Sequence, residues 1–311
     1  MRSTSTCASP IPAFLLTVPI DVTVLLESSG SSNADDTARV RLHTPPKTSR
    51  VVPEVAVDTV RRDLLVDVSC ARSLVARFGE QSDSFRIIAI DLARHLATGS
   101  TSLLGTSAAI VMAPELANGM TAAEAIQKLR GALPHVGIYV VARQTGEVAR
   151  IMPRLATAGV DEVFSFDSRA DVVAFEETMT ARLSAPAPET EMRLLWKWFR
   201  QSAERSLVMH CVRNGFRLDD WTIRSKVFSA CRKTLQNRMS DVEVPSPGML
   251  SRYGRVLHAQ ELERRGVKPT LVVAATLGFP SAGAMQRSRR RLRKALMTRG
   301  RQAAVFASLL R

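Results

Sequence analysis

The chain has 311 residues, of which 45% are hydrophobic, and a formal net charge of +14. This length is typical of two domains with ordinary cores, and no run approaches the roughly 18 uncharged apolar residues of a membrane helix. We therefore expect no membrane partner. The apolar stretch 10–19 is short and lacks a basic flank, so no signal peptide is expected either.

The four cysteines are far apart and form no CxxC pair or Cys/His cluster. This spacing predicts no metal site and no cofactor held by thiolates. Free thiols are typical of the reducing cytoplasm, which is the expected location. Glycine-rich phosphate loops and GxSxG elbows are also absent from the sequence.

Residues 1–59 mix polar, Ser-rich and Pro-containing stretches and are expected to form an irregular extension. From 60 to 183, short β-rich runs alternate with helical patterns, which predicts a parallel sheet covered on both faces. Pro153 is expected to kink or restart the fourth helix. The expected strands are 64–68, 85–90, 108–112, 137–142 and 163–166, and the expected helices are 71–78, 92–97, 122–133, 148–158 and 172–183.

The stretch Ser184–Pro188 reads Ser-Ala-Pro-Ala-Pro, so a semi-rigid linker is expected at 184–189. Charge changes at the same place. Residues 190–311 carry 25 Lys and Arg against 8 Asp and Glu, whereas residues 1–189 carry 18 against 21. A strongly positive unit attracts a polyanion, most commonly DNA. The alternative is a basic, solvated surface without a partner.

The unit 190–311 is expected to be all helical. Its strongest signal lies in Thr270–Arg293, where an apolar helix is followed by Gly278, a residue suited to a left-handed turn. Phe279 is expected to fill the core beneath the turn, and Ser281 to cap a second helix that directs Met285 inward. A helix, a glycine turn and a cationic helix form a helix–turn–helix arrangement, whose second helix enters the major groove.

The pattern Arg255-x-x-x-Ala259-x-x-Leu262, followed by Ala274-x-x-x-Gly278-Phe279-x-Ser281, resembles the DNA-binding domain of the AraC family of transcription regulators. The resemblance covers about residues 190–296. It implies a double helix–turn–helix domain, with a central helix at 249–265 and both reading helices in the major groove.

The resemblance assigns the first helix–turn–helix unit to 222–239. There Ser225 stands in place of the usual small alanine and Ser229 in place of the usual glycine, and Asp219 or Asp220 is expected to cap the first helix.

The residues expected to face DNA combine amides, which can pair with adenine, with cations, which can pair with guanine or hold phosphates. Besides double-stranded DNA, the expected partners are a second copy bound through the N-terminal domain and RNA polymerase. The expected DNA-facing residues are Arg232, Lys233, Gln236, Asn237, Arg255, Ser281, Ala282, Gln286, Arg287, Arg290 and Arg291.

The stretch AIVMAPELANG, followed by GIYVVAR and AGVDEVF, resembles the receiver domain of response regulators, which has a flavodoxin-like fold. A working receiver needs a phosphorylatable Asp after the third strand, a hydroxyl after the fourth and a Lys after the fifth. Here those positions hold Ala113-Pro114, Ala142 and Ser165-Phe166. Only Asp67 ends the first strand, so we expect a receiver-like domain that is not phosphorylated and serves sensing or dimerisation. A generic doubly wound domain is the alternative.

These features predict a sequence-specific transcription regulator without catalytic activity. A nonspecific DNA-binding or scaffolding protein with an α/β interaction module is the second hypothesis. The third is a DNA-processing enzyme such as a recombinase, which would need a nucleophile such as Tyr253 near the basic unit.

Overall fold

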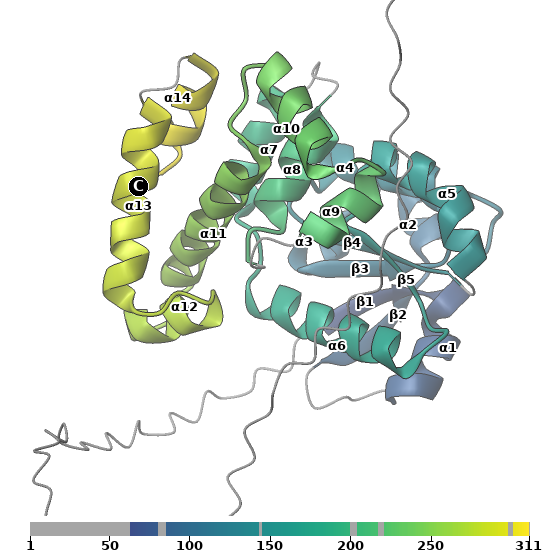
Figure 1. The fold of residues 1–311 in the computed structure, drawn as a ribbon. Coiled ribbons are helices and arrows are strands. Elements are labelled where there is room, and N and C mark those ends of the chain that lie inside the picture. Colours follow the sequence, from purple (N-terminus) through teal and green to yellow (C-terminus); the bar gives the residue numbers. More distant parts are fainter. Residues whose placement is uncertain are drawn as a thin grey trace, which may run out of the picture. The chain divides into compact units, whose positions relative to one another are not determined.

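The computed structural model describes residues 63–79, 85–142, 145–199, 204–216, 221–297 and 301–310. The expected irregular extension, 1–59, and the candidate capping residues Asp219 and Asp220 lie outside the described residues. The described chain consists of an α/β region followed by a helical region (Figure 1).

Five parallel strands form one sheet in the order β2-β1-β3-β4-β5. This is the flavodoxin-like order, in which the chain changes direction of progress between β1 and β3. The predicted α/β class and strand number are therefore confirmed. The strands are β1 (Asp63–Asp67), β2 (Arg86–Ile90), β3 (Ala109–Met112), β4 (Gly137–Ala142) and β5 (Glu162–Ser165).

Helices cover both faces of the sheet (Figure 1). Helices α1 (Val68–Phe78) and α6 (Arg169–Ser184) pack on one face, where Phe175 meets Phe164 edge to face. Burial on both faces explains why the strands are almost continuously apolar. The other face carries α2 (Leu92–Thr98), the unpredicted short helix α3 (Ser102–Thr106), α4 (Ala122–Ala132) and α5 (Thr145–Ala158).

Side-chain caps decide several boundaries that periodicity placed only approximately. The Asp67 carboxylate accepts a hydrogen bond from the Ser69 amide at 3.0 Å, so α1 begins at Val68, three residues before the predicted start. The same carboxylate accepts from the Leu92 amide at 3.0 Å and ties the start of α2 to β1. Helix α5 continues through Pro153, so the expected restart does not occur there.

The helical region contains two central helices, α8 and α11, with the other helices around them. On its first helix, Leu195 and Phe199 are buried, whereas Leu194 and Trp198 are 47% and 57% exposed. The helices are α7 (Glu189–Trp198), α8 (Arg205–Arg213), α9 (Trp221–Phe228), α10 (Arg232–Asp241), α11 (Pro247–Arg264), α12 (Thr270–Thr276), α13 (Ala282–Met297) and α14 (Arg301–Ser308).

A buried ionic network joins the two regions at the amino end of the sheet. Asp161, which precedes β5, accepts from Arg130 Nη2 of α4 at 2.8 Å and from Arg213 Nε of α8 at 2.7 Å. It also accepts from the Ile138 amide and from Asn214 Nδ2, both at 2.8 Å. All three charged side chains are at most 1% exposed. Four groups from α4, α8, β4 and the residue after α8 therefore donate to this one carboxylate.

The surroundings of Asp161 keep it ionised. Burial opposes ionisation, but Arg213 and Arg130 outweigh that effect, and the pKa of Asp161 lies below its ordinary value. Burial, together with the nearby Arg213, lowers the pKa of Arg130 to about 9, although Asp161 opposes the shift. Arg130 thus remains charged at neutral pH, and the pair forms a buried salt bridge.

The segment expected to be a linker is buried. Residues 185–188 lie between α6 and α7, and Ala185 and Ala187 are 1% and 3% exposed. His258 of α11 contacts the Pro186 carbonyl at 3.0 Å, and Arg182 of α6 donates to the Arg213 carbonyl at 2.8 Å. The domain boundary predicted at 184–189 stays a prediction, but Ala185 and Ala187 each pack within a hydrophobic cluster.

Candidate nucleic-acid interface

The second helix–turn–helix unit is formed by α12, a turn at Gly278 and α13. Gly278 has φ +67°, and the Phe279 amide donates to the Ala274 carbonyl at 2.8 Å, closing the helix end around a left-handed residue. Ser281 Oγ accepts from the Ala284 amide at 3.1 Å and caps α13. The predicted turn and cap are confirmed. The unit packs on α11 through one buried cluster, with Phe279 against it, that includes Ala259, Leu262, Val273, Ala274, Leu277 and Met285.

The first unit, α9 and α10, has the same kind of turn. Ser229 has φ +47°, and the Ala230 amide donates to the Ser225 carbonyl at 3.2 Å. Ser225 and Ser229 therefore occupy the positions that Ala274 and Gly278 occupy in the second unit. The helical region contains two helix–turn–helix units related by about fifty residues, as the sequence predicted.

The first turn is strained because Ser229 has a side chain in a left-handed conformation, which costs roughly 1–2 kcal/mol for an L-residue. We expect Ser229→Gly to raise the free energy of unfolding by up to about 1 kcal/mol.

Gly278→Val, at the second turn, should lower the free energy of unfolding by about 2 kcal/mol. The space around Gly278 is open, but a β-branched residue resists this backbone conformation. Urea unfolding of both variants checks the pair, and equal effects of the same sign would contradict the assignment.

Helix α10 presents part of its predicted reading face to solvent. Arg232, Lys233 and Asn237 are exposed, Gln236 is half-buried, and Leu235 underneath is buried. Arg238, on the same helix, pairs with Glu204 at 2.8 Å. The cationic N-terminal turn of α10 is thus accessible to a ligand.

Helix α13 is the more cationic of the two. Of the residues predicted to face DNA, Arg287, Arg290 and Arg291 are exposed. Ser281, Ala282 and Gln286 are half-buried, which limits their reach to a ligand lying close to the start of the helix. Arg293 and Lys294 extend the exposed cationic surface toward the end of the helix.

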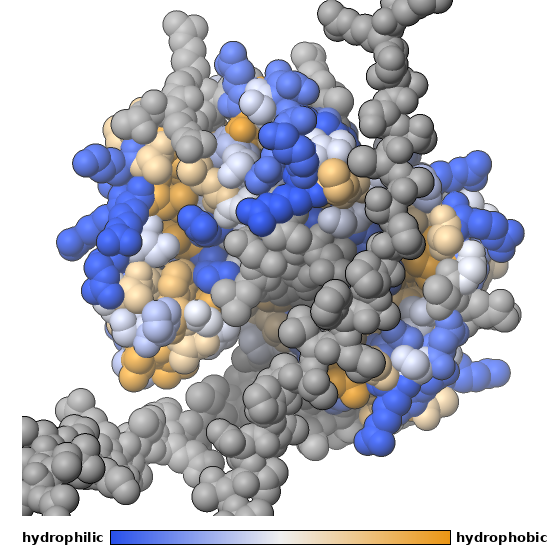
Figure 2. Space-filling view, in the orientation of Figure 1, coloured by the Kyte–Doolittle hydropathy of each residue, from blue (hydrophilic) through white to orange (hydrophobic). Residues whose placement is uncertain are grey.

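Figure 2 shows hydrophilic side chains along α13 and over α10 in a single view. The cationic character of α13 comes from the exposed arginines along it, which favour an anionic ligand at this helix.

Arg255 differs from the other predicted contact residues. Its Nε donates to the Gly215 carbonyl at 3.3 Å, and its guanidinium lies 5.6 Å from the ring centre of Phe279. The side chain is half-buried and joins α11 to the turn of the second unit. In this structure, Arg255 supports the fold beneath α13 rather than projecting from the cationic face.

One cation that sequence reasoning missed lies beside α13. Arg252 of α11 is exposed and, with Arg287 and Arg291, lines a groove of about 460 Å³ whose floor includes Met249 and Leu292. Its position three residues before Arg255, about one turn earlier on the same helix, was the only signal in the sequence. Arg289, in contrast, is held by Glu263 at 2.9 Å and turns away from this groove's lining.

The receiver-like positions in the α/β region lie where the sequence placed them. Strand β3 ends at Met112, before Ala113 and Pro114, and β4 ends at Ala142. Asp67 is buried, with its carboxylate engaged by backbone amides. Among the described residues, no group of three or more His, Cys, Asp or Glu could hold a metal ion.

Tyr253, the nucleophile that a recombinase would need, is buried in the helical core. Its ring meets that of Phe306 edge to face, with the ring centres 5.1 Å apart. Burial raises the pKa of Tyr253 well above its ordinary value, and the nearby Glu191 raises it further. A DNA phosphate cannot reach this hydroxyl in the present structure.

Within the described ranges, no helix is long and apolar enough to cross a membrane.

The chain matches no protein-family model. No curated protein matches it significantly. Among solved structures it is similar to RcsB from Salmonella enterica serovar Typhimurium, solved bound to promoter rprA in the presence of phosphomimetic BeF3⁻. The identity is 10% and the TM-score 0.31, over 70% of this chain and 98% of RcsB. The geometry of this chain defines an α/β region with the flavodoxin-like strand order, followed by a helical region with two helix–turn–helix units.

Proposed function

We propose that this chain is a sequence-specific transcription regulator that binds double-stranded DNA through α10 and α13. The observation that carries the proposal is the pair of matching turns at Ser229 and Gly278, each followed by a helix with exposed cations. The proposal follows the AraC family that the sequence resembles, in which two reading helices enter the major groove. The excess of Lys and Arg over Asp and Glu in 190–311 supports a polyanionic partner.

We further propose that the α/β region is not switched by phosphorylation. A phosphoryl acceptor at the end of β3 would have to be a carboxylate, and Met112, Ala113 and Pro114 provide none. This region would instead sense a ligand or pair two copies of the chain, and RNA polymerase is a further proposed partner.

Selection of bound sequences from a random DNA pool tests the function directly. We expect a preferred site, bound about 10³-fold or more tightly than random DNA at physiological salt. Uniform affinity for all pool members would instead favour the second candidate, a nonspecific DNA-binding scaffold.

Two groups of α13 variants should behave differently. Gln286→Ala and Arg287→Ala should relax base preference, because these side chains lie nearest the start of the reading helix. Arg291→Ala and Arg293→Ala should weaken binding to every sequence and reduce the slope of log affinity against log salt by about 0.9 each.

Gel shifts with the selected site and a scrambled site, across a salt series, distinguish these outcomes. The matched control is Arg72→Ala, which removes an exposed arginine from α1 in the α/β region and should change neither slope nor preference. Loss of affinity to the same extent in all four α13 variants on both DNAs would remove the reading-helix assignment.

A further inference from the structure

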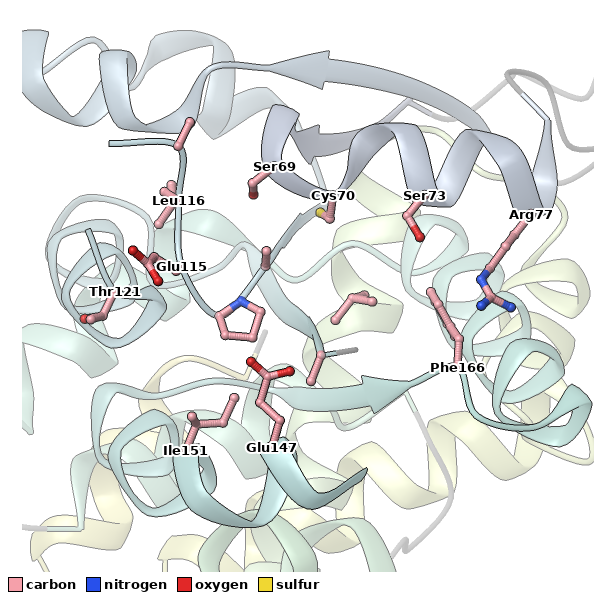
Figure 3. A pocket seen from close by; sticks show the side chains of 15 residues that line it. Ser69, Cys70, Ser73, Arg77, Glu115, Leu116, Thr121, Glu147, Ile151 and Phe166 are labelled. Atoms are coloured by element: carbon pink, nitrogen blue, oxygen red, sulfur yellow. The ribbon is translucent and has the colours of Figure 1, made fainter. Parts of the chain in front are cut away.

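A cavity of about 770 Å³ opens at the carboxyl end of the sheet (Figure 3). It lies between the residues that follow β1 and those that follow β3, where the order of strands reverses. Ligands of open α/β sheets bind in the crevice at this point, outside the carboxyl ends of the strands. The Asp161 network joins the helical region to the opposite end of the sheet, and no described residue of the helical region lines this cavity.

The described lining of the cavity combines an apolar middle with opposite charges. Val141 and Ile151 contribute to the apolar part. Arg77 lies at one side, with its guanidinium 5.0 Å from the ring centre of Phe166. Figure 3 places Glu115 and Glu147 away from Arg77, across the apolar part. The hydroxyls of Ser69 and Ser73 lie along α1, on the same wall as Arg77.

We propose that this cavity binds a small zwitterion whose carboxylate and ammonium are separated by an aliphatic chain. Arg77, with the neighbouring Ser73 hydroxyl, would hold the carboxylate, and Glu115 and Glu147 would hold the ammonium. The aliphatic chain would lie along Val141 and Ile151. A cavity of this size is typical of sites for small molecules.

The separated charges favour a zwitterion over an ion of one sign. A simple carboxylate gains Arg77 but brings negative charge toward two glutamates, and a simple amine gains the glutamates but leaves Arg77 without its anion. Only a ligand with both charges matches both ends of the cavity.

The test uses the full chain without DNA, so its result is independent of the proposed DNA-binding function. Thermal unfolding and titration calorimetry are measured with 6-aminohexanoate and 5-aminopentanoate, and with hexanoate and hexylamine as single-charge controls. We expect saturable stabilisation by both zwitterions at millimolar concentration or below, with at least tenfold weaker binding of each control.

Arg77→Met and Glu147→Gln should each weaken zwitterion binding at least tenfold. The matched control Arg72→Met, on the same helix but outside the cavity lining, should leave it unchanged. Arg77→Lys keeps the charge and should retain most of the binding, which separates loss of the ligand contact from loss of folding. Absence of saturable binding at about 10 mM, or equal binding of hexylamine and 6-aminohexanoate, would overturn the proposal.

Discussion

Asp161→Ala is expected to lower the free energy of unfolding by about 4 kcal/mol or to prevent folding. The substitution leaves Arg130 and Arg213 buried at no more than 1% exposure without their shared carboxylate. It also removes the acceptor of the Ile138 amide and of Asn214. Breaking one partner of a buried ion pair costs far more than the pair itself contributes, because the remaining charge keeps its desolvation penalty.

Urea unfolding at pH 7 measures this effect, with Asp63→Ala as the matched control. Asp63 pairs with Arg86 at the exposed side of the sheet, where the two side chains are 41% and 50% exposed, so its loss should cost less than about 1 kcal/mol. Asp161→Asn, which keeps the shape and one acceptor, should fall between the two. An Asp161→Ala variant as stable as Asp63→Ala would show that the network contributes nothing to folding.

The same network predicts a pH dependence. The pKa of Asp161 in the folded chain lies below its value of about 3.9 in an unfolded chain. Its contribution to stability is therefore complete above that value and is lost as the pH falls toward the folded pKa.

Gly254→Ala should destabilise the helical region by more than about 3 kcal/mol. Helices α8 and α11 cross so closely that a Cβ on Gly254 would overlap the Val212 carbonyl oxygen and come within 2.8 Å of its carbon. Backbone atoms cannot rotate away as a flexible side chain can, so the two helices would have to separate. Overpacking of this kind usually costs 1–3 kcal/mol even where side chains can adjust.

Gly248→Ala provides a control within α11 itself. A Cβ at that position meets no atom within 4 Å, so helix propensity alone should leave the variant unchanged or stabilise it by up to about 1 kcal/mol. Thermal and urea unfolding of both variants check the comparison. Similar stabilities for the two would mean that the close approach at Gly254 is absent in solution.

Both predictions concern the attachment of the cationic helices to the rest of the chain. Arg213 extends from α8 to Asp161, and α8 is held against α11 at Gly254. Helix α13 in turn packs on α11. The proposed reading helix α13 is thus connected to the sheet through α11, α8 and the Asp161 network.

Local sequence patterns were sufficient for the α/β class, the five strands and the second turn. The periodicity of strands and helices can be recognised because each element buries one face or stripe of side chains. The second turn can be recognised because Gly278 and Ser281, which form it and cap the next helix, lie within four residues of each other. The same reasoning placed Arg287, Arg290 and Arg291 on an exposed face, because Met285 and Leu292 define the buried side of α13. Whether these residues read bases stays a prediction.

Tertiary structure alone decided the rest, because the deciding partners are distant in sequence. In the sequence alone, Arg213, Arg255 and Arg289 cannot be distinguished from arginines on the surface. Their partners lie 24 to 52 residues away: Asp161 for Arg213, Gly215 and Phe279 for Arg255, and Glu263 for Arg289. The burial of residues 185–188 could not be predicted for the same reason, because a Pro-rich composition indicates a solvated linker, and His258, which contacts the Pro186 carbonyl, is 72 residues away. A sequence records which side chains can pair, and only the folded chain determines which of them meet.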